Sequence, residues 1–368
     1  MRVLMCGGGT GGHINPAIAI ANEIKSREES VIEFVGTSHG LECKLVPEAG
    51  YTLHTVNVQG FKRKLTLKNV KALVHAYTSV FEAKKIIKSF SPDVVVGTGG
   101  YASWPTVRAA AKLGIPTVIQ EQNAFPGVTT KKLSKFVDTV CISFEGSEKY
   151  FDPAVRSKLV LTGNPVKPNN FNRAEARRKL GIKDDEIYVL SSGGSLGADK
   201  VNCFVIDAMD IYRDNAKIRH THAVGHIGWE KFSEIIKEKK LDECRNYEIL
   251  EYIYDMQLRQ AAADIVISRA GAITTAELAL IGRATVFIPS PNVAEDHQYK
   301  NAMVLKNADA AEVIRESELD GKILAEKVLE LAADGEKRRK MEANMKKFGK
   351  PNATVEIVDQ IYKVVKSR

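Results

Sequence analysis

The sequence predicts an α/β protein built from two Rossmann-like halves, each a doubly wound and mainly parallel sheet. Short apolar runs alternate with helical patterns along the whole chain, which is the βαβ signature of such sheets. A glycine-rich turn follows the first expected strand of each half. With 368 residues, of which 44% are apolar, the chain is long enough to bury two cores.

The first half is expected to cover residues 1–163. Its expected strands are residues 3–6, 31–35, 52–56, 93–96, 117–119, 139–142 and 159–161. Helical patterns lie between them, near residues 16–27, 40–48, 68–90, 102–112, 128–136 and 145–150. This alternation predicts parallel pairing, because a crossover between parallel strands needs a connection of helical length.

The alternation breaks at residues 162–170, where turn-forming residues cluster and a linker is expected. The second half should therefore cover residues 164–348. Its expected strands are residues 187–190, 219–223, 248–250, 264–267, 285–288 and 311–313, again with helices between them. A last helical pattern at residues 355–365 lies in the C-terminal segment 349–368, which we expect to pack back on the first half.

The composition argues against several classes of protein. Five cysteines, an odd number without close pairs, suit a reducing cytosol and argue against a zinc site or a disulfide framework. No run approaches the roughly 18 apolar residues of a membrane span. The N-terminus runs directly into a glycine turn, so it reads as a first strand rather than a signal peptide.

The charge balance favours anionic partners. Lys and Arg number 53 against 45 Asp and Glu, which gives a formal net charge of +8. Phosphates, nucleic acid and an anionic membrane face would all suit this balance. The basic residues are scattered, without a known nucleic-acid motif and with little aromatic interleaving, so nucleic acid is not expected as a partner.

The first glycine turn, residues 7–13, reads GGGTGGH. Its spacing fits G-x-G-x-x-G, but a dinucleotide site also needs an acidic residue at the end of the second strand. That strand ends in Gly36-Thr37, and Glu33 lies in its middle, which disfavours a dinucleotide. His13 stands where the helix begins. It is either a packing residue or a group that faces the reaction, and the open glycine backbone around it favours the second.

Two further glycine turns follow expected strands. Residues 191–198 (SSGGSLGA) could cradle a phosphate with backbone N–H groups and the Ser195 hydroxyl, or could form a purely structural turn. Residues 97–101 (GTGGY) follow the expected strand at 93–96. Two facing domains with such turns at their strand ends would enclose a cleft for a nucleotide diphosphate and an acceptor.

Residues 268–277 (SRAGAITTAE) form the most informative turn, between an apolar strand and a helix that closes on Gly282. Ligands bind at the carboxyl ends of parallel strands, and the first turn of a helix offers unpaired N–H groups to an anion. Gly271 and Ala272 would let a ligand approach the backbone. Glu277 could accept hydrogen bonds from a diol such as ribose, or could simply complement the helix dipole.

Taken in this order and spacing, the chain resembles the family 28 glycosyltransferases nearly from end to end. The matching motifs are residues 8–13 with 16–17, 99–103, 121–123, 162–166, 193–195, 268–272, and 296–298 with 301–302. The resemblance implies the GT-B fold, two Rossmann-like domains facing a cleft. It also implies an inverting enzyme of peptidoglycan synthesis that moves GlcNAc from UDP-GlcNAc to the C4 hydroxyl of MurNAc in lipid I, the undecaprenyl-pyrophosphoryl-MurNAc-pentapeptide, to form lipid II.

The resemblance also implies roles for particular residues. Ile253 would meet the uracil through its backbone, and Glu277 would hold the ribose hydroxyls. The other donor-binding residues would be Lys167, Ser195, Ala272, Ile273, Thr274, Thr275 and Ala276. The GlcNAc hydroxyls would be read by Asn123, Gln298 and Asn301. The first domain would contribute Thr10, Gly11, Gly12 and His13 to the donor phosphate and the acceptor, with Gly100 and Tyr101 on the acceptor side.

Three positions depart from the family pattern, and each affects one contact. Lys167 replaces the usual Arg, which keeps the charge and loses the planar fork. Leu196 replaces the usual Gln, which removes a polar contact, and Trp104 replaces a glycine.

The chemistry needs a base near the acceptor hydroxyl and stabilisation of charge on the leaving diphosphate. His13 is the best titratable candidate for the base, although it could assist the diphosphate instead. Helix N-termini after Gly194 and Gly271 could stabilise the diphosphate. The sequence has no Asp-x-Asp motif, so neither a bound metal nor a cofactor is expected.

A lipid-linked acceptor implies a peripheral enzyme on the cytoplasmic face of the bacterial cell membrane, in contact with its anionic surface. Residues 61–65 (FKRKL) lead into a helix with an apolar stripe and a lysine rim, which suits an interfacial helix, although the stripe could also be core. The stripe is Val70, Leu73, Val74, Tyr77 and Phe81, and the rim is Lys68, Lys71, Lys84 and Lys85. The alternatives are another UDP-sugar transferase and a UDP-GlcNAc epimerase, which the loop at residues 10–13 and the Gly-Gly-Tyr motif disfavour, and a non-catalytic nucleotide-binding regulator, which would not explain His13.

Overall fold

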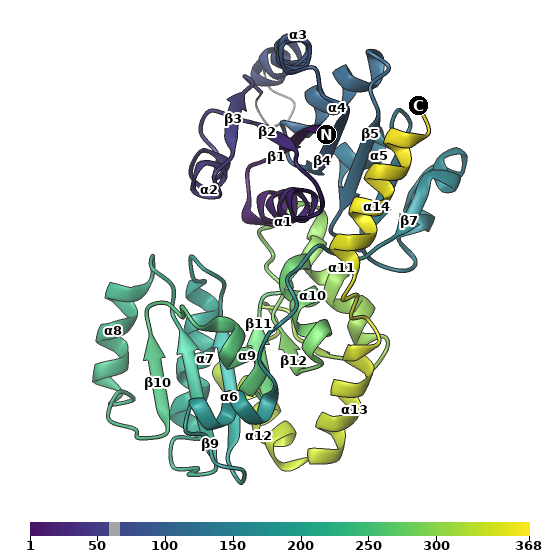
Figure 1. The fold of residues 1–368 in the computed structure, drawn as a ribbon. Coiled ribbons are helices and arrows are strands. Elements are labelled where there is room, and N and C mark those ends of the chain that lie inside the picture. Colours follow the sequence, from purple (N-terminus) through teal and green to yellow (C-terminus); the bar gives the residue numbers. More distant parts are fainter. Residues whose placement is uncertain (59–66) are drawn as a thin grey trace. The chain divides into compact units, whose positions relative to one another are not determined.

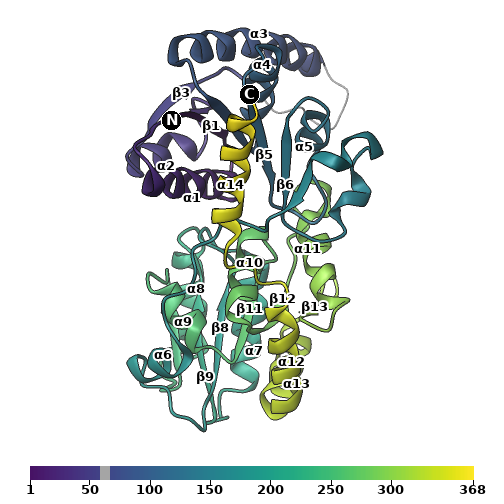
Figure 2. The ribbon, with the colours of Figure 1, turned by 45° about the vertical axis from the view of Figure 1, so that its right-hand side comes forward.

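The computed structural model describes residues 1–58 and 67–368, with the side chains of residues 67–77 left out. The chain forms two compact units: Met1–Lys167 with Lys350–Arg368, and Pro168–Gly349. Each is a parallel sheet with helices on both faces (Figures 1 and 2). The expected α/β class with two doubly wound parallel sheets is confirmed.

Over the described residues, the strand order of the first sheet is β3-β2-β1-β4-β5-β6-β7, and neighbouring strands pair in parallel. The strands are β1 (Arg2–Gly7), β2 (Val31–Gly36), β3 (Thr52–Thr55), β4 (Val94–Gly99), β5 (Thr117–Glu121), β6 (Thr139–Ile142) and β7 (Leu159–Leu161). The order reverses between β1 and β4. In open α/β sheets ligands bind outside the carboxyl ends of the strands at such a reversal.

Helices cover both faces of this sheet. They are α1 (Gly11–Arg27), α2 (Glu42–Glu48), α3 (Leu67–Phe90), α4 (Ser103–Lys112), α5 (Val128–Leu133) and α14 (Ala353–Lys366), with 3-10 turns η1 (Ser147–Tyr150) and η2 (Pro153–Lys158). Side chains alternate along β1, so Val3 and Met5 pack with α1 and α14 while Leu4 and Cys6 pack with α3 and α4. Helix α14 therefore completes the core of the first unit although it comes last in the chain.

The second sheet has the order β10-β9-β8-β11-β12-β13 among the described residues, again with parallel neighbours. The strands are β8 (Ile187–Ser192), β9 (Ile218–Ala223), β10 (Tyr247–Leu250), β11 (Ile265–Ser268), β12 (Ala284–Phe287) and β13 (Glu312–Val313). The helices are α6 (Arg173–Lys179), α7 (Asp199–Ile211), α8 (Trp229–Glu238), α9 (Met256–Ala262), α10 (Ala272–Ile281), α11 (His297–Lys306), α12 (Gly321–Ala333) and α13 (Gly335–Lys346), with the 3-10 turn η3 (Ala294–Asp296). The order reverses between β8 and β11, so the turns after these two strands lie side by side.

Helix α1 begins five residues earlier than the sequence pattern predicts. The helical pattern was expected near residues 16–27. In the structure Pro16 lies inside the helix, which begins at Gly11. The glycines and His13 thus belong to the first turn of the helix rather than to the loop before it.

Part of the expected membrane-facing segment lies outside the described residues. Residues 61–65, and the side chains of Val70, Leu73, Val74 and Tyr77, lie outside the described part of the chain. Over the part that is described, no helix is long and apolar enough to cross a membrane.

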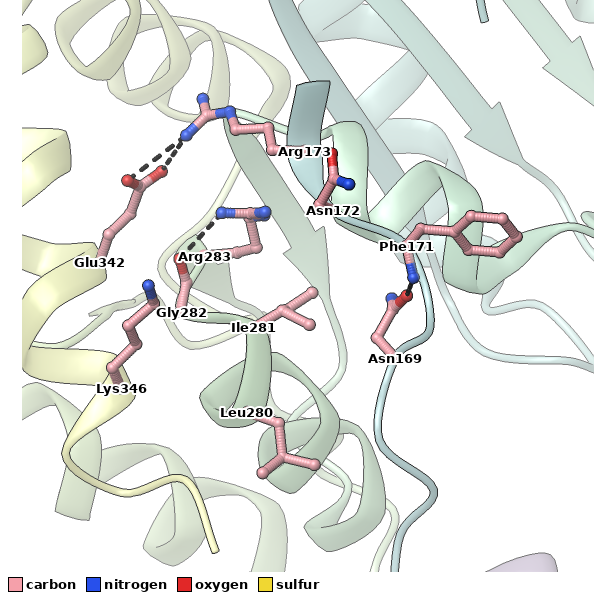
Figure 3. A pocket seen from close by; sticks show the side chains of 10 residues that line it. All are labelled: Asn169, Phe171, Asn172, Arg173, Leu280, Ile281, Gly282, Arg283, Glu342 and Lys346. Atoms are coloured by element: carbon pink, nitrogen blue, oxygen red, sulfur yellow. Dashed lines mark hydrogen bonds and ion pairs between the residues drawn. The ribbon is translucent and has the colours of Figure 1, made fainter. Parts of the chain in front are cut away.

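A hollow of about 430 Å³ opens in the second unit (Figure 3). Arg173 pairs there with Glu342, with 3.2 Å between Nη1 and Oε1, and Arg283 donates to the carbonyls of Gln260, Ala261 and Gly282. Burial and then the nearby Arg173 lower the pKa of Arg283 to about 10. These charges hold α6, α9, α10 and α13 together, and the residues of the expected site do not line this hollow.

Asp264 is the buried acid that ties α6 to the sheet. Its carboxylate accepts hydrogen bonds from Arg173, from Arg177 Nη1 at 2.8 Å and from the Tyr188 N–H at 2.8 Å, and the residue is 5% exposed. The substitution Asp264→Asn should lower the free energy of unfolding by about 3 to 5 kcal/mol, because it leaves a buried guanidinium without its counter-charge. Urea denaturation followed by circular dichroism measures this loss.

The matched control is Asp309→Asn. Asp309 pairs with Lys340 at 3.2 Å, but the two side chains are 72% and 67% exposed, so the change should be below about 1 kcal/mol. Equal losses in the two variants would refute a structural role for Asp264.

Candidate active site

In the first unit, the β1–α1 loop and the β4–α4 turn pack backbone against backbone. Gly100 has φ +80°, and a Cβ there would stand 2.2 Å from the Gly8 carbonyl oxygen. The Thr98 hydroxyl donates to the His13 carbonyl at 2.8 Å. The contact therefore requires glycine at position 100, and it brings the expected donor-side residues 10–13 next to the expected acceptor-side turn.

The His13 ring is held at the start of α1. Its Nδ1 lies 3.0 Å from the Gly8 carbonyl oxygen and 3.3 Å from the Thr10 hydroxyl. A carbonyl oxygen only accepts hydrogen bonds, so Nδ1 must carry a proton to bond with Gly8, and in the neutral ring the lone pair then lies on Nε2. A Cβ on Gly99 would stand 3.0 Å from Nε2, which shows how closely the β4–α4 turn approaches the ring.

The start of α1 is suited to an anion. Among the described residues, Thr10 makes no side-chain cap hydrogen bond, and the first helical turn, which holds Gly11 and Gly12, contains no acid. The N-terminal N–H groups and the positive end of the helix dipole are therefore available to a ligand. Tyr101, next to this turn, is 53% exposed.

Asn123 is oriented by a buried acid at the end of β5. The Glu121 Oε1 accepts from the Asn123 backbone N–H at 3.0 Å and from its Nδ2 at 3.1 Å. The Gln122 side chain donates to the Thr98 carbonyl at 2.8 Å, which links the end of β5 to the end of β4. Lys167 is exposed at the last residue before the second unit.

In the second unit, the β8–α7 loop rests on the β9–α8 turn. Gly197 has φ +84°, and a Cβ there would stand 2.2 Å from the Val224 carbonyl oxygen. The Asn202 side chain donates to the same carbonyl at 2.9 Å and so anchors the contact. Ser195 lies exposed in this loop beside Leu196, which is 60% exposed.

The turn before α10 presents a second open helix start. Gly271 is its extended N-cap, and among the described residues the first turn lacks both an acid and a side-chain cap. Ile273, Thr274 and Ala276 are half-buried, and Ala272 and Thr275 are buried. The Thr275 hydroxyl donates to the Ala272 carbonyl at 2.8 Å, so it stabilises the helix.

Glu277 lies in the second turn of α10, where the electrostatic effect of the helix dipole on a side chain is small. Complementing the dipole is therefore a weak explanation of this acid. Burial raises the pKa of its carboxyl group, and a hydrogen bond from Gln260 partly opposes that shift. A half-buried carboxyl group with few donors is suited to accept hydrogen bonds from a ligand.

Three other expected residues lie in the same unit. The Ile253 side chain is 3% exposed within an apolar cluster, so a ligand could reach this residue only through its backbone. Asn301 is fully buried, and its Nδ2 donates to the Ala270 carbonyl at 3.3 Å, which ties α11 to the turn. Gln298 Oε1 accepts from the Ser290 N–H at 2.9 Å. Before it, Glu295 and Asp296 both adopt positive φ, a strained conformation that is typical of functional loops.

Sequence reasoning missed Glu42, a fully buried acid on α2. Its Oε2 accepts from the Gly9 N–H at 2.8 Å, and its Oε1 accepts from the Thr37 N–H at 2.8 Å and the Thr37 hydroxyl at 2.7 Å. Burial alone would raise the pKa of this carboxyl group, but these donors outweigh it and the pKa is lowered. The available signal was an acid two residues after Gly40, at the start of a short helix that follows β2.

The described residues contain no group of three or more His, Cys, Asp or Glu side chains placed to hold a metal ion.

Comparison with known proteins assigns both units. Residues 3–142 match the Glycosyltransferase family 28 N-terminal domain, and residues 188–357 match the Glycosyltransferase family 28 C-terminal domain. The chain is 42% identical to a protein of Desulforamulus reducens, over 99% of each chain, and 44% identical to one of Thermoanaerobacter sp. strain X514, over 100% of each. Both carry the name UDP-N-acetylglucosamine--N-acetylmuramyl-(pentapeptide) pyrophosphoryl-undecaprenol N-acetylglucosamine transferase.

Solved structures agree with this assignment. Acinetobacter baumannii MurG superposes with a TM-score of 0.80 at 29% identity, covering 98% of this chain and 99% of that one. The complex of S. aureus MnaA with UDP reaches a TM-score of 0.70 at 14% identity, covering 100% and 97%, and shows likeness of fold alone. With both domains matched and full-length relatives above 40% identity, this chain belongs to glycosyltransferase family 28.

Proposed function

We propose that the chain transfers GlcNAc from UDP-GlcNAc to the C4 hydroxyl of MurNAc in lipid I, which forms lipid II with inversion at the anomeric carbon. The observation that carries the proposal is identity above 40%, along essentially the whole chain, to relatives with that name. The geometry supports it, because each unit presents an open helix start beside a tight glycine turn.

The second unit would bind the donor. The diphosphate would lie at the start of α10 and the β8–α7 loop, where Ser195 and Thr274 add hydroxyl donors. The half-buried Glu277 carboxylate would accept hydrogen bonds from the ribose hydroxyls, and the Ile253 backbone would meet the uracil. Lys167 would add positive charge to the diphosphate from the linker.

The sugar would be read by side-chain amides. Gln298 is the second residue of α11 and follows the strained turn at Glu295 and Asp296. Asn301 would support the sugar-facing turn at Ala272 and Ile273 through its hydrogen bond to the Ala270 carbonyl. Asn123 would add a contact from the first unit, with its amide oriented by the Glu121 carboxylate. These contacts would select GlcNAc through its hydroxyl groups.

The first unit would bind the acceptor beside Gly100 and Tyr101, and His13 would act as general base. Its Nε2 lone pair would take the proton of the C4 hydroxyl as that oxygen attacks the anomeric carbon and UDP leaves from the opposite side. The helix start at Gly11 and Gly12 would stabilise negative charge on the phosphates. Donor and acceptor chemistry would then reside in different units.

Transfer of labelled GlcNAc from UDP-GlcNAc to a short-chain lipid I analogue tests this division. The His13→Ala variant should lose about 10² to 10⁴ in kcat while it still binds UDP, because it lacks the base. The Glu277→Ala variant should bind UDP about tenfold more weakly, because it loses hydrogen bonds to the ribose.

Two exposed residues serve as controls for these substitutions. His39 and Glu326 lie outside the proposed contacts, and their alanine variants should behave as wild type. If the folded wild-type protein binds UDP-GlcNAc but does not transfer GlcNAc to lipid I, the proposed acceptor is wrong and the proposed donor site is unaffected.

The raised pKa of Glu277 predicts a pH dependence of donor binding. Only the ionised carboxylate accepts hydrogen bonds from both ribose hydroxyls, so affinity should be full above this pKa and fall as the pH drops through it. The fall should begin at a higher pH than for an ordinary carboxyl group. Titration calorimetry should measure the dissociation constant of UDP between about pH 4.5 and 8, a range that begins near the pKa of an ordinary Glu carboxyl group.

The Glu277→Gln variant provides the reference for this experiment. Dividing its dissociation constant by that of the wild type cancels the titration of UDP itself. The ratio should shrink toward acid pH, and a ratio that stays constant would contradict the proposed ribose contact.

We also propose that α3 lies on the anionic cytoplasmic face of the membrane, where a lipid-linked acceptor must be met. At the described end of this helix Phe81 is 55% exposed, and Lys84 and Lys85 are exposed beside it. An exposed aromatic side chain with a lysine rim is typical of interfacial helices.

Co-sedimentation with phosphatidylglycerol vesicles tests this surface. The triple change Phe81→Asp, Lys84→Glu and Lys85→Glu should reduce binding more than tenfold, since each juxtamembrane lysine contributes about 1 kcal/mol. The control is Phe136→Asp, which alters another exposed aromatic side chain, 41% exposed, in the same unit. Equal binding of the two variants to the vesicles would refute the proposal that α3 contacts the membrane.

A further inference from the structure

Glu42 and His13 bind the two ends of one peptide group. The peptide between Gly8 and Gly9 donates its N–H to Glu42 Oε2 at 2.8 Å, and its carbonyl oxygen lies 3.0 Å from His13 Nδ1. We propose that Glu42 acts on His13 through this peptide, holding the imidazole in the tautomer that leaves Nε2 free and making Nε2 more basic. This inference rests on the proposed function, in which His13 receives the acceptor proton.

The surroundings of Glu42 keep its carboxylate ionised and fixed. It is fully buried, it accepts from Thr37 twice through its other oxygen, and its pKa is lowered by these donors. Three glycines enclose it: a Cβ on Gly8, Gly36 or Gly40 would stand between 2.1 and 2.6 Å from an atom of the Glu42 side chain. A charged acceptor is therefore held in one place against the Gly9 N–H.

A carboxylate that accepts from a peptide N–H polarises the whole peptide group, because hydrogen bonds in a chain strengthen one another. The Gly8 carbonyl oxygen becomes a better acceptor for the Nδ1 proton of His13. A carboxylate that bonds directly to a histidine fixes its tautomer and stabilises its charged form in the same way. Here a single peptide group stands between the two side chains.

The proton balance of this arrangement is simple. During transfer the C4 hydroxyl proton moves to His13 Nε2, and the oxygen forms its bond to the anomeric carbon as the bond to UDP breaks. The Nδ1 proton stays on the ring, the amide proton stays on Gly9, and Glu42 remains ionised. Glu42 is therefore a positioning residue, which stabilises the imidazolium that the reaction creates.

The other groups near the His13 ring either lack an ionisable side chain or are exposed to solvent. Among the described residues, Thr10 and Gly8 hydrogen-bond to the ring and Gly99 lies close to it, and none of the three carries an ionisable side chain. Tyr101, on the turn that packs over the loop, is 53% exposed. Within the described residues, the nearest ionisable link in the hydrogen-bond chain from His13 is Glu42.

The test is Glu42→Gln in the full-length protein, with ¹⁵N-labelled histidine. In the wild type the ¹⁵N spectrum of neutral His13 should show the proton on Nδ1, and in the variant a substantial fraction should carry it on Nε2. Without the carboxylate, His13 should lose its proton at a lower pH. The acid limb of the pH profile of kcat/KM should therefore shift by about 0.3 to 1 pH unit toward lower pH. We expect kcat to fall about tenfold and KM for UDP-GlcNAc to change less than about twofold.

Thr37→Val is the matched control. It removes a hydroxyl donor from the other oxygen of Glu42 and leaves the bond to Gly9 in place, so it perturbs the same buried acid without breaking the chain to His13. It should change both readouts much less than Glu42→Gln does, because the carboxylate and its hydrogen bond to the Gly9 N–H remain. Glu42→Asp, which keeps the charge on a shorter side chain, should shift both readouts in the same direction as Glu42→Gln and by less.

A folded Glu42→Gln protein with the wild-type tautomer and pH profile overturns the inference, as does a loss of activity that only follows the folded fraction. If Glu42→Gln does not fold, the Glu42→Asp result decides by the same two readouts. The spectrum needs no substrate, so its outcome is separable from that of the proposed function. A tautomer shift in a protein that fails to glycosylate lipid I would support the relay and refute the acceptor.

Discussion

Close contact between neighbouring backbone turns at the carboxyl ends of the strands is the constraint on which both half-sites depend. In the first unit Gly100 meets the Gly8 carbonyl, and in the second Gly197 meets the Val224 carbonyl, in each case where a Cβ would stand 2.2 Å from oxygen. Glycine permits this approach, and a buried polar side chain then fixes it. Because the turns cannot spread, the loop before α1 in the first unit and the β8–α7 loop in the second, next to the start of α10, keep a fixed backbone conformation.

Two carboxyl groups illustrate how the fold separates structural from ligand-binding acids. Glu42 receives backbone and hydroxyl donors on both oxygens, and its pKa is lowered despite full burial. Glu277 has Gln260 as its donor, and burial raises its pKa. The difference lies in the number of donors that each acid meets. A satisfied carboxylate positions a loop, whereas a poorly satisfied one is ready to accept hydrogen bonds from a substrate.

Much of the fold could be predicted because its signals are local. Alternating apolar runs and helical patterns placed the strands of both sheets, and the glycine turns after β1 and β8 followed directly from composition. The start of α1 was placed too late: the helix begins with Gly11 and Gly12, and glycine has a low helix propensity that gives no local signal of a helix. The burial of Asn301 could not be predicted either, because an asparagine reads as a polar surface residue in sequence, whereas this one is fully buried in the fold.

By itself, the sequence determined the α/β class, the division into two Rossmann-like halves and the positions of the glycine turns, because periodicity and turn composition depend on residues a few positions apart. Only the tertiary structure decided which side chains hold those turns. Glu42 reaches Gly9 across 33 positions, and Gln122 reaches Thr98 across 24. Such contacts arise when parallel strands bring their carboxyl ends to one edge of a sheet, and a pattern read along the chain does not record which side chains will meet there.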